Sequence, residues 1–303
     1  MKLIQLKDNA MDYNKKIEKF IKDNPLDEKF IDRIPSPRFR YRGDEILNEA
    51  LAAILAGKNL LFVGDKSTGK NVLAENLPYI FKRPLWNVSF HVNVDSSILI
   101  GDDTLHSGNV VFKEGPISIA SKVGGFVVLD EINMAKNEAM SVLHSVLDYR
   151  RTIDVPGYDL IKINPATRFI ATMNYGYEGT RDLNEALLSR FVIIKMPTIE
   201  SKDLKELIKN EYENINDRYL DDISNFFYDL KLKAKSNEIS EYAPDLRGIF
   251  DAIDLVICGV ELGRALNLTI TNKIFDLYEE DLIRDLIKSR FGKSLYYKDI
   301  FNI

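Results

Sequence analysis

The stretch VGDKSTGKNVLAEN, residues 63–76, decides how the rest of the chain is interpreted. It holds two glycines five residues apart, Gly64 and Gly69, and Lys70 follows the second one directly. Glycines at this spacing let main-chain N–H groups close around phosphate oxygens, and the lysine then reaches the outer phosphates. Such loops next carry a serine or threonine whose hydroxyl holds Mg²⁺, whereas this chain has Asn71.

The residues around the loop favour a phosphate site. The apolar run NLLFV, residues 59–63, is typical of a buried parallel strand. A strand, a glycine loop and a helix in this order direct the N–H groups of the helix start at phosphate charge. The alternative is an ordinary strand-to-helix turn. The predicted nucleotide-binding residues here are Gly64, Asp65, Lys66, Ser67, Thr68, Gly69, Lys70, Asn71 and Val72.

A second motif is GGFVVLDEIN, residues 124–133, in which two carboxylates follow an apolar strand. The carboxyl ends of strands in an open α/β sheet form the edge where ligands bind. We expect Asp130 to bind Mg²⁺, mostly through water, and Glu131 to polarise the attacking water. The alternative is an acidic helix cap after a core strand. A third strand, in FIATMNYG, delivers Asn174 to the same edge, where we expect it to orient that water; on its own it would read as a turn asparagine.

With these motifs the chain resembles the AAA+ ATPases and, within them, the MoxR and dynein-related group. The resemblance covers nearly the whole chain, and the segments that carry it are the phosphate loop, VVLDEIN, ATMN, LNEALLSRF and APDLRGIF. It implies an α/β P-loop NTPase (AAA+) fold, with a parallel sheet flanked by helices and a C-terminal all-helical lid domain. It also implies ATP and Mg²⁺ as ligands and a ring of identical chains, usually a hexamer, with ATP bound between subunits.

The resemblance assigns roles to two arginines. The arginine of the SRF segment in such proteins reaches the γ-phosphate on the neighbouring subunit, which indicates Arg190. The lid arginine, here Arg247, closes over the phosphates of its own subunit. For each arginine the alternative is a surface ion pair, which contributes little to stability.

The order of apolar patterns along the chain predicts three parts. Residues 1–42 form a polar helical lead and a connector that contains Pro35 and Pro37. Residues 43–197 alternate strands and helices, as in a parallel sheet covered on both faces. Residues 198–303 show apolar residues at helical spacing only, which predicts a separate all-helical unit.

The sequence predicts two inserted hairpins in the α/β part. The first, residues 97–117, has a predicted Gly108–Asn109 turn between short strands, and the second, residues 151–169, has Pro156–Gly157 between alternating runs. In proteins of the group that the chain resembles, such hairpins face the pore or the partner. Taken alone they would be surface hairpins.

Composition excludes several classes of protein. No segment approaches the roughly 20 apolar residues that span a bilayer, and the first residues contain no apolar signal core. The single cysteine, Cys258, rules out an internal disulfide and a thiolate zinc cluster. A net charge of −5 argues against nucleic acid as the main partner. We therefore expect a cytoplasmic protein without membrane contact.

Asn71 decides whether the phosphate site works. Its amide oxygen is a legitimate ligand for a hard cation but lies one bond further from Cα than a hydroxyl, and Mg²⁺ tolerates misplaced ligands poorly. Asn71 therefore either coordinates the ion directly after a small shift or holds it through water. A dead site would more readily have lost Lys70, Glu131 or Arg190, and all three are present. We expect a working site.

Three functions remain open after these observations. The first is an ATP-hydrolysing, MoxR-like remodelling or chaperone-type motor that acts on a protein client; the resemblance adds a partner with a von Willebrand factor A domain. The second is the motor subunit of a metal chelatase, suggested by a loose similarity of NVDSSILIGDDTL, residues 93–105. The third is a nucleotide-gated scaffold that does not hydrolyse ATP, with Asn71 as its signature.

Overall fold

The computed structural model describes residues 13–91, 94–174 and 183–302. The chain forms two compact units, Met1–Pro197 and Thr198–Ile303, and each is described by itself. Among the described residues no helix combines the length and the apolar character needed to cross a membrane.

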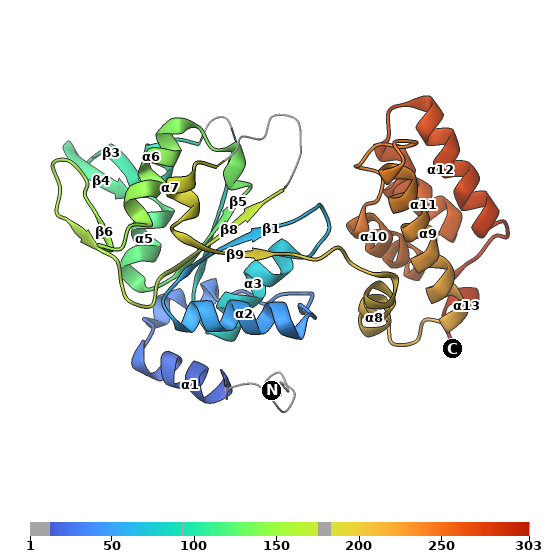
Figure 1. Ribbon diagram of the computed structural model, residues 1–303, viewed down its shortest axis with the longest axis horizontal. Coiled ribbons are helices and arrows are strands. Elements are labelled where there is room, and N and C mark those ends of the chain that lie inside the picture. Colours follow the sequence, from blue (N-terminus) through green and yellow to red (C-terminus); the bar gives the residue numbers. More distant parts are fainter. Residues whose placement is uncertain (1–12, 92–93, 175–182, 303) are drawn as a thin grey trace. The chain divides into compact units, whose positions relative to one another are not determined.

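The first unit is built on a five-stranded parallel sheet in the order β2-β5-β8-β1-β9 (Figure 1). Its strands are β1 (Asn59–Val63), β2 (Leu85–Ser89), β5 (Phe126–Asp130), β8 (Arg168–Met173) and β9 (Phe191–Lys195). Because all pairings are parallel, the carboxyl ends of the five strands lie at one edge of the sheet. The predicted α/β fold with a parallel sheet flanked by helices is confirmed.

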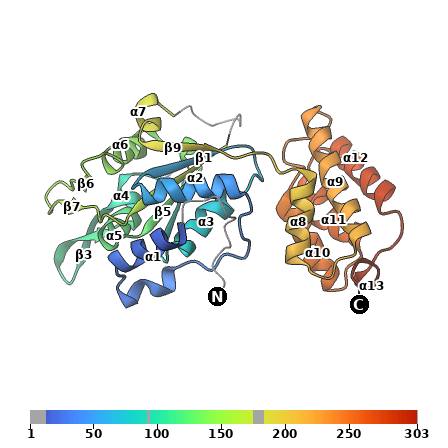
Figure 2. The ribbon, with the colours of Figure 1, turned by 60° about the horizontal axis from the view of Figure 1, so that its bottom comes forward.

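Alternate residues of each strand bury their side chains on opposite faces of the sheet. On β1, Leu60 and Phe62 face one apolar core while Leu61 and Val63 face the other, and all four are at most 2% exposed. The first core is covered by α1 (Tyr13–Asp23), α2 (Asp44–Leu55) and α3 (Lys70–Ile80). The second is covered by α4 (Ser96–Ile100), α5 (Pro116–Val123) and α6 (Asn137–Val146). Figure 2 shows α1, α2 and α3 together on one face. The remaining helical turns of this unit are η1 (Glu28–Arg33), η2 (Ile132–Met134) and α7 (Glu185–Leu188).

The described part of the expected N-terminal lead and connector packs on the α/β unit. Ile17 of α1 is 2% exposed within the core, and the ring of Phe20 meets that of Phe81 edge to face at 5.1 Å. The connector is fixed to α3 by Asn76, whose side chain donates to Phe39 O and accepts from the main-chain N–H of Tyr41. Residues 1–12 of the predicted lead lie outside the described residues.

Both expected hairpins are present, with one correction. The first pairs β3 (Gly101–His106) with β4 (Asn109–Glu114), and the second pairs β6 (Thr152–Ile153) with β7 (Ile161–Lys162). The predicted Gly108–Asn109 turn is wrong by one residue. The two turn residues are Ser107 and Gly108, both with positive φ (50° and 83°), as a type I′ turn requires, and Asn109 already pairs with His106. In the second hairpin Pro156 and Gly157 lie in the connecting loop.

The second unit is helical throughout its described residues, except for one isolated bridge between Ile215 and Phe301. Leu204, Phe226, Ile253 and Ile283 are each at most 1% exposed and come from four different helices. Its elements are α8 (Ser201–Glu211), α9 (Asp217–Lys235), α10 (Leu246–Ile257), α11 (Leu262–Thr269), η3 (Thr271–Lys273), α12 (Leu277–Arg290) and α13 (Tyr297–Ile300).

Candidate nucleotide-binding and hydrolysis site

The glycine loop joins the carboxyl end of β1 to the first residue of α3 (Figure 1). Ser67 and Gly69 both have positive φ, 64° and 83°, which turns successive N–H groups toward one side of the loop. Gly64 is required for a different reason, because a Cβ there would lie 2.9 Å from the carbonyl oxygen of Met196. The loop therefore has the backbone shape of an anion-binding concavity at a helix start.

Lys70 is the first residue of α3, and its side chain folds back over the loop. Its Nζ donates to the carbonyl oxygens of Gly64 (2.8 Å) and Asp65 (2.6 Å), and the residue is 7% exposed. Burial lowers the pKa of Lys70 to about 8, although the negative charges of Asp65, Asp130 and Glu131 oppose that shift. The ammonium is thus held inside the loop, close to three carboxylates.

This lowered pKa predicts that ATP affinity falls as the pH rises through about 8. Phosphate binding needs the charged ammonium, whereas above this pH the nucleotide-free protein has lost the proton from Lys70. ATP binding at pH 9 should then take up a proton, which calorimetry in two buffers of different ionisation enthalpy detects. The Lys70→Arg variant is the control, since its guanidinium stays charged over this range. An affinity that is the same at pH 7.5 and 9.5 in the wild type would contradict the prediction.

The ends of β5 and β8 bring the acidic motif together with Thr172. Because Leu129 pairs with Ala171, the next residues of the two strands, Asp130 and Thr172, lie side by side. The hydroxyl of Thr172 donates to Asp130 Oδ1 and accepts from the main-chain N–H of Glu131 at 3.1 Å. Thr172, which is 1% exposed, therefore fixes both carboxylate residues. We did not single it out from the sequence, although it is the one polar residue in the strand sequence FIATM.

We expect Thr172→Val to lower the free energy of unfolding by about 2 kcal/mol, because it removes a hydrogen bond to a charged group and leaves the partly buried N–H of Glu131 without its partner. Urea unfolding without nucleotide measures this difference. Thr172→Ser keeps the hydroxyl and is the control. Thr172→Val keeps the methyl group and Thr172→Ser removes it, so a Thr172→Val variant as stable as the wild type would show that the hydroxyl does not stabilise the fold.

Glu131 follows β5 in a left-handed conformation (φ 54°, ψ 47°) that is uncommon for a residue with a side chain. Its side chain is exposed, and its Oε1 accepts from Asn174 Nδ2 at 3.5 Å. Asn133 in turn donates to the carbonyl oxygen of Asn174 at 3.1 Å, which fixes the main chain after β8. The structure thus brings the predicted base and the predicted water-orienting residue together at one sheet edge.

The residues that could hold Mg²⁺ are Asn71 and Asp130. Asn71 Nδ2 donates to Asp130 Oδ2 at 3.1 Å, so the amide nitrogen faces the carboxylate. The pair fits the ion once the amide turns its oxygen inward, because both groups then offer the hard oxygen donors that Mg²⁺ prefers. Within the described ranges there is no group of three or more histidine, cysteine or acidic side chains that could hold a metal. The remaining ligands would have to be phosphate oxygens and water.

Arg190 lies at the other edge of the sheet. Arg190 directly precedes β9, and the first residue of β9 pairs with the first residue of β1. The phosphate loop starts after the last residue of β1. The length of β1, four residue steps or about 13 Å, therefore lies between the level of Arg190 and the phosphate loop. The Arg190 guanidinium donates to the carbonyl oxygens of His144 (3.2 Å) and Ala186 and lies 3.7 Å from Asp148 Oδ2. The structure therefore does not place Arg190 at the phosphate loop of its own chain.

Arg247 belongs to the second unit, at the start of α10. Its main-chain N–H donates to Asp245 Oδ1 at 3.0 Å, which caps the helix, and its side chain is exposed. Asp245 Oδ2 also forms an ion pair with Lys273 at 2.6 Å. Its expected phosphate contact stays a prediction.

Comparison with known proteins finds a family model that matches the central part of the chain. Residues 59–191 match the model of the AAA domain of the dynein-related subfamily. The chain is 35% identical over 254 residues to an uncharacterized protein of Staphylococcus haemolyticus, a match covering 82% of this chain and 96% of that protein. It is 33% identical over 275 residues to the uncharacterized protein YojN of Bacillus subtilis, a match covering 89% and 90% of the two chains. A solved structure from Cytophaga hutchinsonii, 17% identical, aligns over 94% of this chain and 96% of that one with a TM-score of 0.48.

Proposed function

The chain carries an AAA domain of the dynein-related subfamily and belongs to one family with the Bacillus and Staphylococcus proteins; from this premise we propose that it is an ATP-hydrolysing motor that remodels a protein partner. The observation that carries the proposal is the pairing of Glu131 with Asn174 beside the loop that holds Lys70. A site that only bound nucleotide would not need a carboxylate and an amide positioned together for water.

Each residue of this edge has one role in the proposed reaction. Lys70 and the N–H groups of the loop bind the phosphates, and Glu131 accepts the proton of the attacking water while Asn174 orients that water. Asp130 and Asn71 would hold Mg²⁺, which when bound neutralises charge on the phosphates.

We further propose that ATP binds between the subunits of a ring, with six as the expected number. The position of Arg190 supports this part, because it lies at the sheet edge opposite its own phosphate loop. A neighbouring subunit is then the natural recipient of its charge. Arg247 would contact phosphates bound to its own subunit.

MoxR-like membership and a client linked to a von Willebrand factor A domain protein also belong to this proposal. They rest on the resemblance in sequence. The two hairpins are the parts of the α/β unit best suited to transmit movement to a client, because they extend from the sheet as separate two-stranded ribbons (Figure 1).

One observation favours a second function, that of a nucleotide-gated scaffold without hydrolysis. In the structure Asn71 presents its amide nitrogen to Asp130, and a permanent hydrogen bond there would occupy the metal-binding carboxylate. The two functions differ in whether this hydrogen bond yields to Mg²⁺.

We expect Asn71→Thr to keep ATP turnover and to lower the Mg²⁺ concentration needed for half-maximal rate, since a hydroxyl at this position binds the ion directly. Asn71→Ala should raise that concentration, because it leaves Asp130 as the only protein ligand. A Mg²⁺ titration of phosphate release measures both. Identical titrations for wild type and both variants would exclude a role for Asn71 in metal binding.

The assembly part of the proposal is tested by native mass spectrometry of Glu131→Gln with ATP and Mg²⁺. We expect ATP-dependent rings of one defined subunit number. Lys70→Ala, which should not bind nucleotide, is the control. A protein that stays monomeric while ATP is bound at saturation would contradict the ring.

A further inference from the structure

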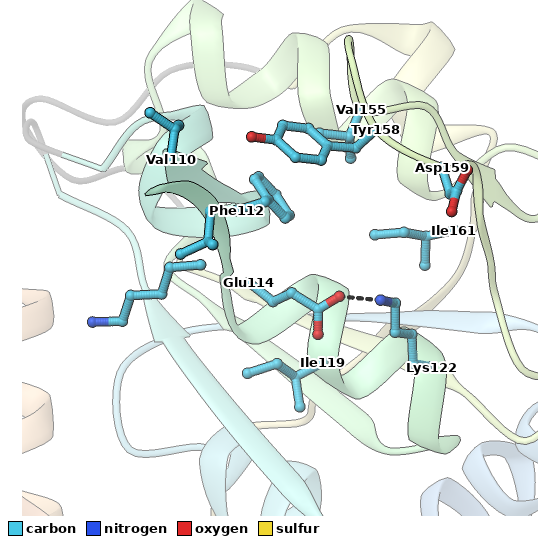
Figure 3. A pocket seen from close by; sticks show the side chains of 11 residues that line it. Val110, Phe112, Glu114, Ile119, Lys122, Val155, Tyr158, Asp159 and Ile161 are labelled. Carbon is cyan, nitrogen blue, oxygen red and sulfur yellow. Dashed lines mark hydrogen bonds and ion pairs between the residues drawn. The ribbon is translucent and has the colours of Figure 1, made fainter. Parts of the chain in front are cut away.

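A cavity of about 810 Å³ lies between the two hairpins of the first unit (Figure 3). Residues 110–114 of β4 form one side of it, α5 contributes Ile119 and Lys122, and the second hairpin contributes residues between 155 and 161. Side chains of β4 from both faces line the cavity while β3 contributes none. The cavity therefore runs along the outer edge of β4, the edge that faces away from β3.

The outer edge of β4 carries main-chain hydrogen-bonding groups that pair with no other strand in the described part of the chain. Antiparallel pairs alternate between hydrogen-bonded and non-hydrogen-bonded positions. The pair that closes the two-residue turn, His106 and Asn109, is a hydrogen-bonded one. Every second pair along the hairpin is then hydrogen-bonded, and the bond from Gly115 N to Ile100 O at 2.7 Å agrees with this alternation. Residues 110, 112 and 114 consequently direct their N–H and C=O groups outward, and within the described ranges β4 pairs with no strand but β3.

The rest of the cavity combines aliphatic and aromatic surface with the charged side chains of Lys122 and Asp159. Ile119, Val155 and Ile161 supply aliphatic surface from three separate segments. The rings of Phe112 and Tyr158 lie 4.9 Å apart, and the Tyr158 hydroxyl donates to Asp103 Oδ1 at 2.5 Å, which fixes the second hairpin against the first. Figure 3 also shows the ion pair between Glu114 and Lys122 within the lining.

We propose that this cavity binds an extended peptide segment of a protein partner, which pairs with β4 as a third strand of the hairpin. Outward N–H and C=O groups on every second residue repeat at about 7 Å, the repeat of a β-strand. Main-chain pairing would provide the affinity, and the aliphatic surface would accept apolar side chains at alternate positions. The volume lies within the range of about 300–1,000 Å³ of ligand cavities.

This inference rests on the proposed function, since it names the class of client that a remodelling motor would hold. It differs from an unspecific apolar contact in one respect. An extended peptide needs the N–H groups of residues 110, 112 and 114, so removing a single donor from this edge should weaken binding while an equivalent change on the other edge should not.

The chain offers a matched pair of substitutions for this test. Val110 and Leu105 are cross-strand partners, both are exposed (65% and 77%), and both direct their N–H groups away from the hairpin. Val110→Pro removes a donor on the cavity edge, and Leu105→Pro removes one on the opposite edge. Proline is tolerated at such outward positions of an edge strand.

The probe is a fluorescein-labelled peptide, acetyl-KVTVTVTK-amide, titrated without nucleotide and followed by fluorescence anisotropy. We expect saturable binding to the wild type and to Leu105→Pro. The affinity of Val110→Pro should be lower by at least about tenfold, because the proline ring removes a hydrogen bond and obstructs the approaching strand. The same peptide with every internal amide N-methylated keeps its side chains and should not bind. Far-ultraviolet circular dichroism and phosphate release should be the same for both variants as for the wild type.

Equal affinities of the two proline variants, or binding of the N-methylated peptide as tight as that of the parent, would overturn the proposal. Absence of binding to the wild type would also overturn it. Because the titration contains no nucleotide, each of these results leaves the ATPase proposal standing. Conversely, a wild-type chain that hydrolyses no ATP would count against the ATPase proposal, and the peptide titration would still give its own result.

Discussion

The Glu131→Gln variant should bind ATP like the wild type and release phosphate at least about 100-fold more slowly, the lower end of what a general base contributes. Glutamine keeps the shape of the side chain and an oxygen that can accept from Asn174 Nδ2. It cannot take up the proton of the attacking water. Phosphate release, together with the nucleotide that remains bound after desalting, measures the two properties separately, and the retained nucleotide should be ATP.

Glu138→Gln is the matched control for this variant. Glu138 is an exposed carboxylate in the first turn of α6, so its replacement removes the same charge from a nearby element outside the site. We expect its turnover to equal that of the wild type. Turnover of Glu131→Gln at the wild-type rate would show that Glu131 is not the base.

Arg190→Ala is expected to lower kcat by about 10³–10⁵ with little change in ATP binding, the effect of losing an arginine supplied across an interface. Arg190 and the phosphate loop of its own chain lie at opposite edges of the sheet, so we expect the ATP of a neighbouring subunit to receive this arginine. Arg150→Ala is the control. Arg150 binds the same carboxylate, Asp148, at 2.8 Å but is exposed and has no predicted catalytic role.

Mixing two inactive variants tests whether Arg190 acts on a neighbour. An Arg190→Ala subunit has an intact phosphate loop and can receive Arg190 from a Lys70→Ala neighbour. Partial ATPase activity should therefore return in mixed rings. If mixed assembly is demonstrated and activity stays at zero, Arg190 does not act in trans.

The sheet and its functional edge could be predicted because β1, β5 and β8 contain short apolar runs, and the residues that follow these runs include glycine, carboxylate and amide residues. Asp130 and Asn174 follow such runs, and parallel pairing alone then brings the two strand ends together. The sequence in this way also indicated that Glu131 and Asn174 lie at the same edge, and the structure shows a hydrogen bond between their side chains. Their catalytic roles stay predictions.

Other features depend on contacts that no local pattern encodes. Thr172 matters because register places it beside Asp130, and an isolated threonine in a strand gives no sign of that. The turn of the first hairpin lies one residue before the predicted one because Ser107 adopts a positive φ, while Asn109 pairs with His106. The packing of α1 on the sheet unit likewise depends on Ile17 and Phe20, which fit an apolar surface formed by distant residues.

The most direct measurement of the central claim is steady-state phosphate release by the purified wild-type chain with ATP and Mg²⁺, with Lys70→Ala measured in parallel. The structure places Lys70, Asp130, Glu131 and Asn174 around the carboxyl ends of three adjacent strands. We expect turnover in the wild type that requires Mg²⁺ and is absent from Lys70→Ala. A wild-type chain that binds ATP yet releases no more phosphate than Lys70→Ala would contradict the motor and favour the scaffold.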